Sequence, residues 1–361
     1  MCTGSIVPKE DVLSDRLFQA TIHTLELFSV YVGNRLGLYS ALAKLGPANA
    51  AALAHEAGIA ERYAREWLEQ QAVAGFLIAE PRSSDAASRR YRLPEAHSLV
   101  LCENGHPSHV APFAQMIAGI GAALPEVIAA YKSGGGVPYT RYGEDFRHGQ
   151  GGINRAAFIH DLPQKWLPAM ADIDARLRRR PAARVADVGC GHGWSTVALA
   201  NAYPMAQVIG YDSDEASVRE ARKLAAEQAS PAYFECKDAA SLSEVGPFDV
   251  VFLLESLHDM SRPSEALAGL RRALSDEGSL IIADERVADD FISPGDEVER
   301  IMYGWSVVHC LPVAMAEQPS EAIGTAIRPT TVETLAERAG FRQFEILPIR
   351  NQFFRFYRLR P

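Results

Sequence analysis

The segment VADVGCGHGWS, residues 185–195, constrains the fold of this chain more than any other feature. It follows a short apolar stretch at 184–188 and precedes a helical pattern from about Gly193 to Ala202, so its glycines form a turn from strand to helix. Glycine allows a ligand to approach the backbone closely, because no side chain stands in the way. Such a turn after the first strand of an open α/β sheet lies at the usual ligand crevice. The segment therefore predicts a nucleotide-like ligand.

Beyond Pro181 the chain alternates between apolar strand patterns and amphipathic helix patterns. We expect an α/β fold: a doubly wound, Rossmann-like sheet that ends in an antiparallel hairpin, behind a mostly helical N-terminal domain. The expected strands are 184–188, 207–211, 232–236, 249–254, 279–283, 344–348 and 353–359, and the expected helices are 193–202, 215–228, 263–274 and 331–339, with a long insert at 286–330.

The first half of the chain predicts a winged helix. A long apolar helix from about Lys9 to Tyr39 packs either within its own domain or at a dimer interface. Residues 41–95 then show two short helices, at 50–57 and 61–74, and two strands, at 76–80 and 91–93, around the polar loop 81–90. We expect three parts: a helical, winged-helix dimerisation domain (1–110), linking helices with a glycine-rich segment that is either a mobile lid or a plain connection (111–165), and a ligand-binding domain (166–361).

Charge and composition exclude several classes of partner. The net charge is −9, and residues 181–361 hold 27 acidic against 17 basic side chains, which disfavours nucleic acid and anionic membranes. The second short helix contains two basic residues, Arg62 and Arg65, and three glutamates. A helix that reads DNA is expected to be basic, so this helix does not fit that role. The longest apolar run, 116–131, contains Pro125 and Glu126, so we expect no membrane span. Five scattered cysteines and a charged N-terminus favour a reduced, cytoplasmic setting.

The spacing of the glycines distinguishes between nucleotide ligands. Trp194 stands where the dinucleotide fingerprint has its third glycine, and Asp187, two residues before the first glycine, would repel a pyrophosphate. Both residues disfavour a nicotinamide oxidoreductase and favour a cationic ligand. Asp212, at the end of the second strand, is where an acid commonly accepts hydrogen bonds from ribose hydroxyls.

Together the D-x-G-x-G-x-G motif, the acid after strand two and the final hairpin resemble class I S-adenosyl-L-methionine (SAM) methyltransferases. With its winged helix, the whole chain is similar to bacterial small-molecule methyltransferases, whose architecture is similar to that of plant O-methyltransferases. The resemblance implies SAM as cofactor, S-adenosyl-L-homocysteine as product, a small-molecule acceptor methylated on O or N, and a homodimer. The cofactor contacts that it implies are Asp187, Gly189, Gly191, Gly193, Asp212, Ser213, Asp238, Ala239 and Leu254. A helix N-cap is the alternative role for Asp238.

The resemblance also places a catalytic pair after the fourth strand. His258 would be the general base, and Asp259 follows it in the chain. Asp284, at the end of the expected strand 279–283, would hold the His258 ring in place. Glu255 and Glu285 are alternatives to Asp284, or surface charges. Met260 departs from the family's usual tryptophan. His309 is a second candidate base, or a core histidine beside Cys310.

The sequence also offers candidate residues for an acceptor pocket and argues against a metal site. The candidate acceptor contacts, each with plain core as its alternative, are Tyr139, Tyr142, Trp166, Met302, Trp305 and His309. Metal-assisted transfer needs clustered carboxylates, and Asp289 and Asp290 have no obvious partners, so we predict no metal. The sequence thus predicts SAM-dependent methyl transfer by in-line displacement. The alternative is a SAM-binding transcriptional regulator that uses the winged helix on DNA.

Overall fold

The computed structural model describes residues 10–80 and 85–361 and separates into two compact units. The first ends at Ala118, and the second runs from Gly119 to Pro361. The division falls inside helix α6 (Pro112–Ser133), so each unit is described by itself below. The predicted domain boundaries after residues 110 and 165 stay predictions.

The first unit consists of one long helix, several short helices and a two-stranded wing. The expected single helix from Lys9 to Tyr39 breaks at Gly37, whose φ of +65° turns the chain between α1 and α2. The apolar pattern runs through this break, which is why periodicity alone missed it. The wing pairs Ile78 with Arg92 and Ala79 with Tyr91, and part of the predicted loop between them, 81–84, lies outside the described residues. The elements are α1 (Glu10–Arg35), α2 (Leu38–Leu45), α3 (Ala50–Ala57), α4 (Glu61–Val73), β1 (Ile78–Ala79), β2 (Tyr91–Arg92) and α5 (Glu95–Leu101).

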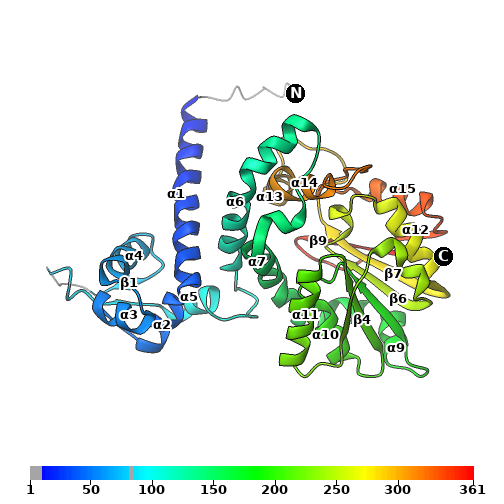
Figure 1. Cartoon of the computed structure of the whole chain (residues 1–361), viewed down its shortest axis with the longest axis horizontal. Coiled ribbons are helices and arrows are strands. Elements are labelled where there is room, and N and C mark those ends of the chain that lie inside the picture. Colours follow the sequence, from blue (N-terminus) through cyan, green and yellow to red (C-terminus); the bar gives the residue numbers. More distant parts are fainter. Residues whose placement is uncertain (1–9, 81–84) are drawn as a thin grey trace, which may run out of the picture. The chain divides into compact units, whose positions relative to one another are not determined.

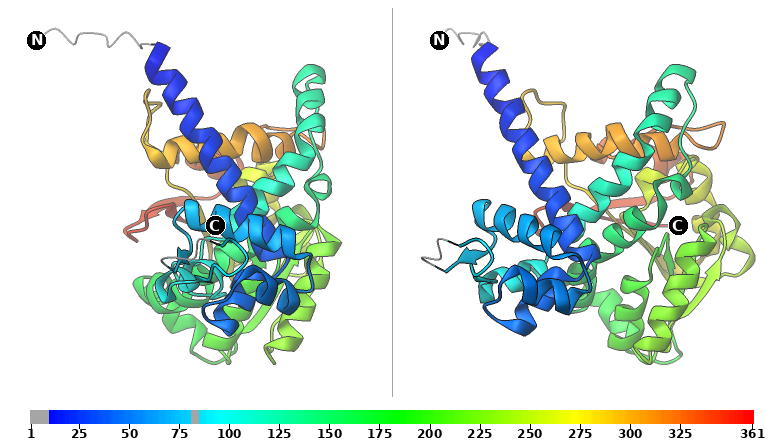
Figure 2. Two further views of the ribbon diagram at one scale, coloured as in Figure 1. Left: turned by 90° about the vertical axis from the view of Figure 1, so that its left-hand side faces the viewer. Right: turned by 60° about the vertical axis from the view of Figure 1, so that its left-hand side comes forward.

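A small aromatic core holds α1 to the rest of this unit. Tyr39 packs edge-on against Trp67 with ring centroids 5.0 Å apart, and the Trp67 indole N–H donates to the Ser29 carbonyl at 3.0 Å. A Cβ on Gly33 would lie 2.6 Å from these rings, so α1 can approach them only with glycine there. Within α1, which Figures 1 and 2 draw in dark blue, Val30 and Gly33 are the buried residues. The amino-terminal half of α1 therefore leaves its apolar side chains uncovered by this core.

The second unit is built on a seven-stranded sheet with the order β5-β4-β3-β6-β7-β9-β8. The first five strands in this order are parallel, and β9 and β8 close the predicted antiparallel hairpin at the edge. This confirms the predicted fold class (Figure 1). Strand β7 starts at Leu274, earlier than the expected strand 279–283. The strands are β3 (Arg184–Val188), β4 (Gln207–Asp212), β5 (Tyr233–Cys236), β6 (Phe248–Leu254), β7 (Leu274–Glu285), β8 (Gln343–Leu347) and β9 (Phe354–Arg360).

Helices cover both faces of this sheet. In β6, Val251 and Leu253 point into a core shared with α12 (Pro263–Ala273) and α15 (Pro329–Arg338), whereas Val250, Phe252 and Leu254 join the opposite core. That opposite core includes residues of α9 (Ala171–Leu177) and α10 (Trp194–Ala202); α11 (Glu215–Glu227) packs beside α10. Burial on both faces explains the nearly continuous apolar run of β6. Because parallel strands end at one edge, the turns after β3, β4 and β6 meet there.

The glycine-rich segment differs from the expected loop. Gly151 lies inside helix α7 (Gly143–Ala156), which continues into the π-helical η2 (Ala157–Trp166) and α8 (Leu167–Ala169). Gly136 packs directly on the backbone of the insert: a Cβ there would lie 2.2 Å from Ala316 N. The Val137 N–H also donates to Pro312 O at 2.8 Å. These contacts join residues 136 and 137 to the insert, and both interpretations of the segment, mobile lid and plain connection, stay predictions.

The insert after β7 contains one continuous helical stretch, made of α13 (Glu297–Trp305), the π-helical η5 (Ser306–Cys310) and α14 (Leu311–Ala314). Helix α6 is long and apolar enough to cross a membrane by length and composition, which is weak evidence because core helices pass the same test. About 33% of its most apolar window is buried.

Candidate functional site

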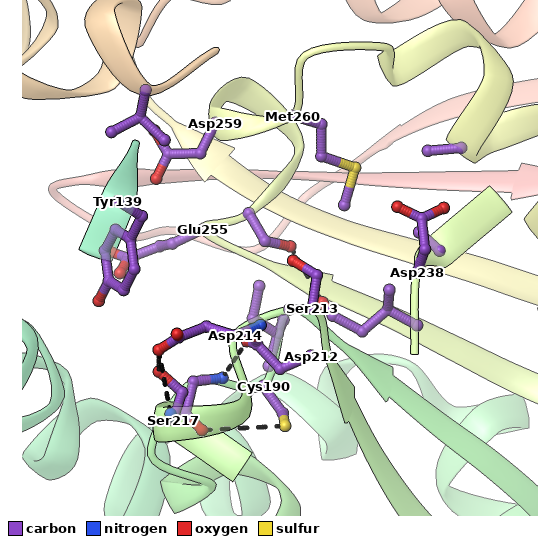
Figure 3. Close-up of a pocket in the computed structure, with 18 of the residues that line it drawn as sticks. Tyr139, Cys190, Asp212, Ser213, Asp214, Ser217, Asp238, Glu255, Asp259 and Met260 are labelled. Carbon is purple, nitrogen blue, oxygen red and sulfur yellow. Dashed lines mark hydrogen bonds between the residues drawn. The ribbon is translucent and has the colours of Figure 1, made fainter. Parts of the chain in front are cut away.

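A cavity of about 490 Å³ opens at the carboxyl edge of the sheet, within the second unit. Its walls come from the turns after β3, β4 and β6, from α7, and from the end of α14. Figure 3 shows Asp212, Ser213 and Asp214 on one side of it and Tyr139, Glu255 and Asp259 on another. The volume lies in the range of cavities that enclose a drug-sized ligand.

The turn after β3 has the backbone that its glycines predict. Gly189, Gly191 and Gly193 have φ values of +71°, +51° and +81°. A Cβ on Gly189 would lie 2.5 Å from the Ser256 Cβ, so a larger residue would be both strained and crowded. Gly189 and Gly191 line the cavity; Gly193 instead packs against Phe234 and serves the start of α10.

Asp212 ties the glycine turn to the end of β4. One of its carboxylate oxygens accepts from Gly191 N–H and the other from Asp214 N–H, both at 2.8 Å. Burial raises the pKa of Asp212, while these two N–H donors oppose the rise. Asp214 in turn caps α11 and pairs with Arg147 at 2.9 Å. Asp212 thus shapes the turn and also lines the cavity.

Asp187 does not line the cavity and lies behind the turn. It is 1% exposed, and the hydroxyls of Ser195 and Thr196 both donate to its carboxylate at 2.6 Å. Burial raises its pKa to about 6 despite these donors. The predicted direct contact of Asp187 with the ligand is therefore replaced by a structural role: its carboxylate anchors the start of α10 beneath the glycine turn.

The other predicted cofactor contacts come together on the cavity wall, namely Ser213, Asp238, Ala239 and Leu254. Asp238 also caps the 3-10 helix η3 (Ala239–Glu244), because its carboxylate accepts from Ala240 N–H at 2.8 Å. Its two sequence-based interpretations, ligand contact and N-cap, are therefore compatible.

Helix α7 forms a wall that the sequence had placed in a loop. Arg147, Gln150, Gly151 and Asn154 line the cavity from this helix. A Cβ on Gly151 would lie 2.5 Å from the His192 ring, so this glycine sets how closely α7 approaches the glycine turn. Its neighbour Arg155 stacks over Trp194 at 4.1 Å.

Two glutamates lie at the ends of β6 and β7, Glu255 partly buried and Glu285 buried. Glu255 lines the cavity with a φ of +57° and accepts a hydrogen bond from the Asn154 amide, and Glu285 is 8% exposed. Burial raises the pKa of both carboxyls, and the charge of Glu255 raises the pKa of Glu285 further. The surface-charge alternative for these residues is therefore wrong.

His258 lies in 3-10 helix η4 (Leu257–Asp259), buried between two carboxylates. Its Nδ1 lies 2.7 Å from Asp284 Oδ1, and its Nε2 lies 3.4 Å from Asp259 Oδ1. Burial alone lowers the pKa of His258, but the charges of Asp284 and Asp259 outweigh it and hold the pKa well above its usual range. Asp259 lines the cavity and His258 stands directly behind it.

His309 belongs to an aromatic cluster. It stacks on Phe146 with centroids 3.9 Å apart and meets Tyr142 edge-on at 4.5 Å. Burial lowers its pKa to about 4, so it is neutral, and it does not line the cavity. This position fits the core alternative better than a catalytic base. Tyr142 is buried with its hydroxyl on Val308 O at 2.9 Å, whereas Tyr139 lines the cavity.

The remaining candidate acceptor contacts lie away from the cavity. Trp166 packs in the sheet core against Phe354 and Phe356, with centroids 5.8 and 5.0 Å apart. Met302 is buried in α13, and Trp305 ends that helix; neither lines the cavity. Asp289 is exposed and pairs with Arg355, outside the site.

Family comparisons identify the two parts of this architecture. Residues 180–340 match the model of a methyltransferase domain. The second unit therefore contains a methyltransferase domain. Residues 25–103 match the Rv2258c-like winged HTH domain, which agrees with the winged helix predicted in front of the methyltransferase domain.

Individual relatives agree with this assignment. A trans-aconitate 2-methyltransferase of Methylobacterium nodulans is 32% identical over 149 residues, which are 41% of this chain and 55% of that protein. The chain spans about half the length of the curated relatives that it matches. Human N-acetylserotonin methyltransferase, solved with SAM, has the same fold, with a TM-score of 0.70, 18% identity and 99% of both chains covered. An O-methyltransferase family protein from Burkholderia thailandensis has a TM-score of 0.64 at 15% identity over 98% of both chains.

The cavity uses residues on both sides of the point where the methyltransferase domain begins. Tyr139 and the residues of α7 precede residue 180 and nevertheless form one wall. The available sequence signal was the glycine pair at 151–152, which suggested a loop although Gly151 marks close helix packing.

Proposed function

We propose that this protein transfers a methyl group from SAM to the oxygen or nitrogen of a small-molecule acceptor. The observation that carries the proposal is one cavity lined by both the glycine turn with Asp212 and the loop after β6, whose His258 pairs with Asp284 of β7. The methyltransferase domain supports it, and so does the human relative solved with SAM.

The residues present fit SAM. Gly189 and Gly191 leave backbone exposed to the cavity, and Asp212 presents a partly buried carboxylate that can accept hydrogen bonds from ribose hydroxyls. Asp238 lines the wall beyond it, where an adenine amino group would meet its carboxylate. When bound, SAM supplies a methyl group on a positively charged sulfur, which an acidic cavity accommodates. The cavity wall cations Arg147, Lys237 and Arg262 are each paired with a carboxylate.

We assign the general base to His258. The Asp284 carboxylate accepts from Nδ1–H, which leaves Nε2 to take a proton from an acceptor hydroxyl. Asp259 now occupies the space between Nε2 and the cavity, so we infer that a bound acceptor displaces this carboxylate or hydrogen-bonds through it. The acceptor must lie close to the methyl donor and in line with it, because the displacement needs both.

A homodimer through the first unit belongs to the same proposal. Leu13, Leu17 and Phe18 on α1 are 56%, 61% and 65% exposed. Large apolar side chains clustered at such exposure are typical of an interaction surface. A second copy of the chain is the partner that the winged-helix unit of this architecture would bind.

We also propose a cytoplasmic protein that binds neither nucleic acid nor membrane. The four described cysteines are free, which supports a reduced compartment. The winged HTH match favours one alternative, a SAM-binding regulator of transcription. Salt-sensitive, sequence-specific retention of DNA in a gel-shift assay would support the regulator.

The proposed activity is tested by incubating the protein with SAM and a panel of phenols, aromatic amines and carboxylic acids, and measuring S-adenosyl-L-homocysteine. We expect acceptor-dependent product that falls on the order of 100-fold or more in His258→Ala. No product with any acceptor class, in a protein that binds SAM, would count against the enzyme and leave the regulator.

A further inference from the structure

The loop after β6 and the insert after β7 bring together three side chains of different chemistry. His258 and Asp259 come from η4, and Cys310 comes from the last residue of η5. One nitrogen, one oxygen and one sulfur atom of these residues all lie within 4.8 Å of one another. His258 and Cys310 are 52 positions apart in the sequence, so no local motif predicts this cluster.

The surroundings of the cluster are those of a metal site. The Asp284 carboxylate accepts a hydrogen bond from His258 Nδ1 at 2.7 Å. This bond fixes the ring so that Nε2 faces Asp259 and Cys310. Histidines that bind metals are often oriented in the same way, by a carboxylate behind the ring. Asp259 Oδ1 is buried and has no hydrogen-bond partner in the structure. The nearest donor to this oxygen, His258 Nε2, stands 3.4 Å away, which is longer than an ordinary hydrogen bond, so a cation there would add an interaction that the oxygen lacks.

The donor atoms select the class of cation. Imidazole, thiolate and carboxylate together suit Zn²⁺ or Cd²⁺, whereas Mg²⁺ and Ca²⁺ prefer oxygen alone. Asp259 lines the cavity, so an ion in the cavity meets the cluster without crossing the core. Three protein ligands with one side toward a cavity resemble the open arrangement of zinc sites that keep a position for water.

We propose that His258, Asp259 and Cys310 bind one soft divalent cation, such as Zn²⁺, and that its binding inhibits methyl transfer. The ion forms bonds to Nε2, to a carboxylate oxygen and to the sulfur. The thiol proton of Cys310 and the Nε2 proton of the charged imidazole leave to solvent, and no electron is transferred. Inhibition follows because the metal occupies the nitrogen that would accept the acceptor's proton, and this part rests on the proposed function.

Cadmium titration of the full chain tests the site directly, because a thiolate bound to Cd²⁺ gives an ultraviolet charge-transfer band. We expect one ion per chain with this band in the wild type and in the control Cys236→Ser, whose cysteine is exposed. Cys310→Ser should lose the band and bind at least 10-fold more weakly. Asp284→Asn should weaken binding on the order of 10- to 100-fold. Wild-type affinity and an unchanged band in Cys310→Ser would overturn the proposal.

X-ray absorption on the zinc-loaded wild type provides a test that needs no variant. We expect one sulfur at about 2.3 Å and nitrogen or oxygen ligands at about 2.0–2.2 Å. A shell without sulfur contradicts the site. Inhibition is measured separately, as the zinc concentration that halves turnover, which should be at least 10-fold higher in Cys310→Ser than in Cys236→Ser. Binding is measured without turnover, so a failure of the metal site and a failure of the proposed methyl transfer give different results.

Discussion

Replacing Asp284 by asparagine separates the charge of this residue from its hydrogen bonds. His258 Nδ1–H and the Glu285 N–H are both bonded to the same oxygen, Oδ1, at 2.7 and 2.9 Å, whereas Oδ2 is buried without a partner. Asparagine can keep its oxygen at the Oδ1 position and place its amide nitrogen where Oδ2 stands. The imidazole then keeps its orientation and tautomer, and loses only the neighbouring negative charge.

The expected effect on the pKa follows from the strength of that bond. A hydrogen bond to a charged group contributes about 1.5–3 kcal/mol and a neutral one about 0.5–1.5 kcal/mol, so the change removes roughly 1–2 kcal/mol from the imidazolium form. At about 1.4 kcal/mol per pKa unit, the pKa of His258 falls by about one unit. A base must be unprotonated to act, so the variant reaches its active form at lower pH. Its maximal rate should fall less than about 100-fold, because the base is weaker but still in place.

The assay is the pH dependence of kcat/KM for the best acceptor. The wild-type rate should rise with pH through a midpoint above the ordinary histidine pKa, because Asp284 and Asp259 raise the pKa of His258. In Asp284→Asn the midpoint should shift down by about one unit. Asp289→Asn is the matched control, since that carboxylate is 78% exposed and pairs only at the surface. A midpoint that stays in place in a folded Asp284→Asn that binds SAM would refute His258 as the titrating base.

Three further predictions test the architecture around the site. Gly151→Ala should weaken SAM binding on the order of 10-fold or more, because its Cβ would lie 2.5 Å from His192; Gly121→Ala, with open space around it, should bind SAM as the wild type does in calorimetry. Burial lowers the pKa of His192 to about 4, so the free energy of unfolding should fall by up to about 3 kcal/mol as the pH falls from about 6.5 towards 4. Urea unfolding at pH 7 and pH 4.5 measures this loss. The loss should be smaller in His192→Asn than in the wild type, and an equal loss would contradict the prediction. Leu17→Glu with Phe18→Glu should turn a dimer into monomers in analytical ultracentrifugation, whereas a wild type that is already monomeric would remove the proposed interface.

The sequence predicted the fold wherever a local pattern was strong. The boundaries of β3 and α3 agree with those expected, because Gly189 and Gly58, both with positive φ, end these elements. Patterns failed where tertiary packing decides the structure. Gly151 looks like a loop residue, yet it lies inside α7, where the lack of a side chain leaves room for the His192 ring. The break at Gly37 was hidden because apolar residues continue on both sides of it.

The candidate site was predicted unevenly for similar reasons. Predicted residues at a strand end or directly after it, such as Asp212 and Ser213, do line the cavity. The role of Asp187 required knowledge of Ser195 and Thr196, whose hydroxyls donate to its carboxylate behind the turn. The approach of Cys310 to His258 depends on how the insert folds back, which no local spacing encodes.

Calorimetric titration with S-adenosyl-L-homocysteine tests the central claim most directly. The account predicts one binding site per chain in the wild type. Asp212→Ala should bind at least about 100-fold more weakly, because it loses both the predicted ribose contact and the carboxylate that holds the Gly191 and Asp214 N–H groups. Absence of binding to the wild type at millimolar ligand would contradict the account, and so would unchanged affinity in a folded Asp212→Ala.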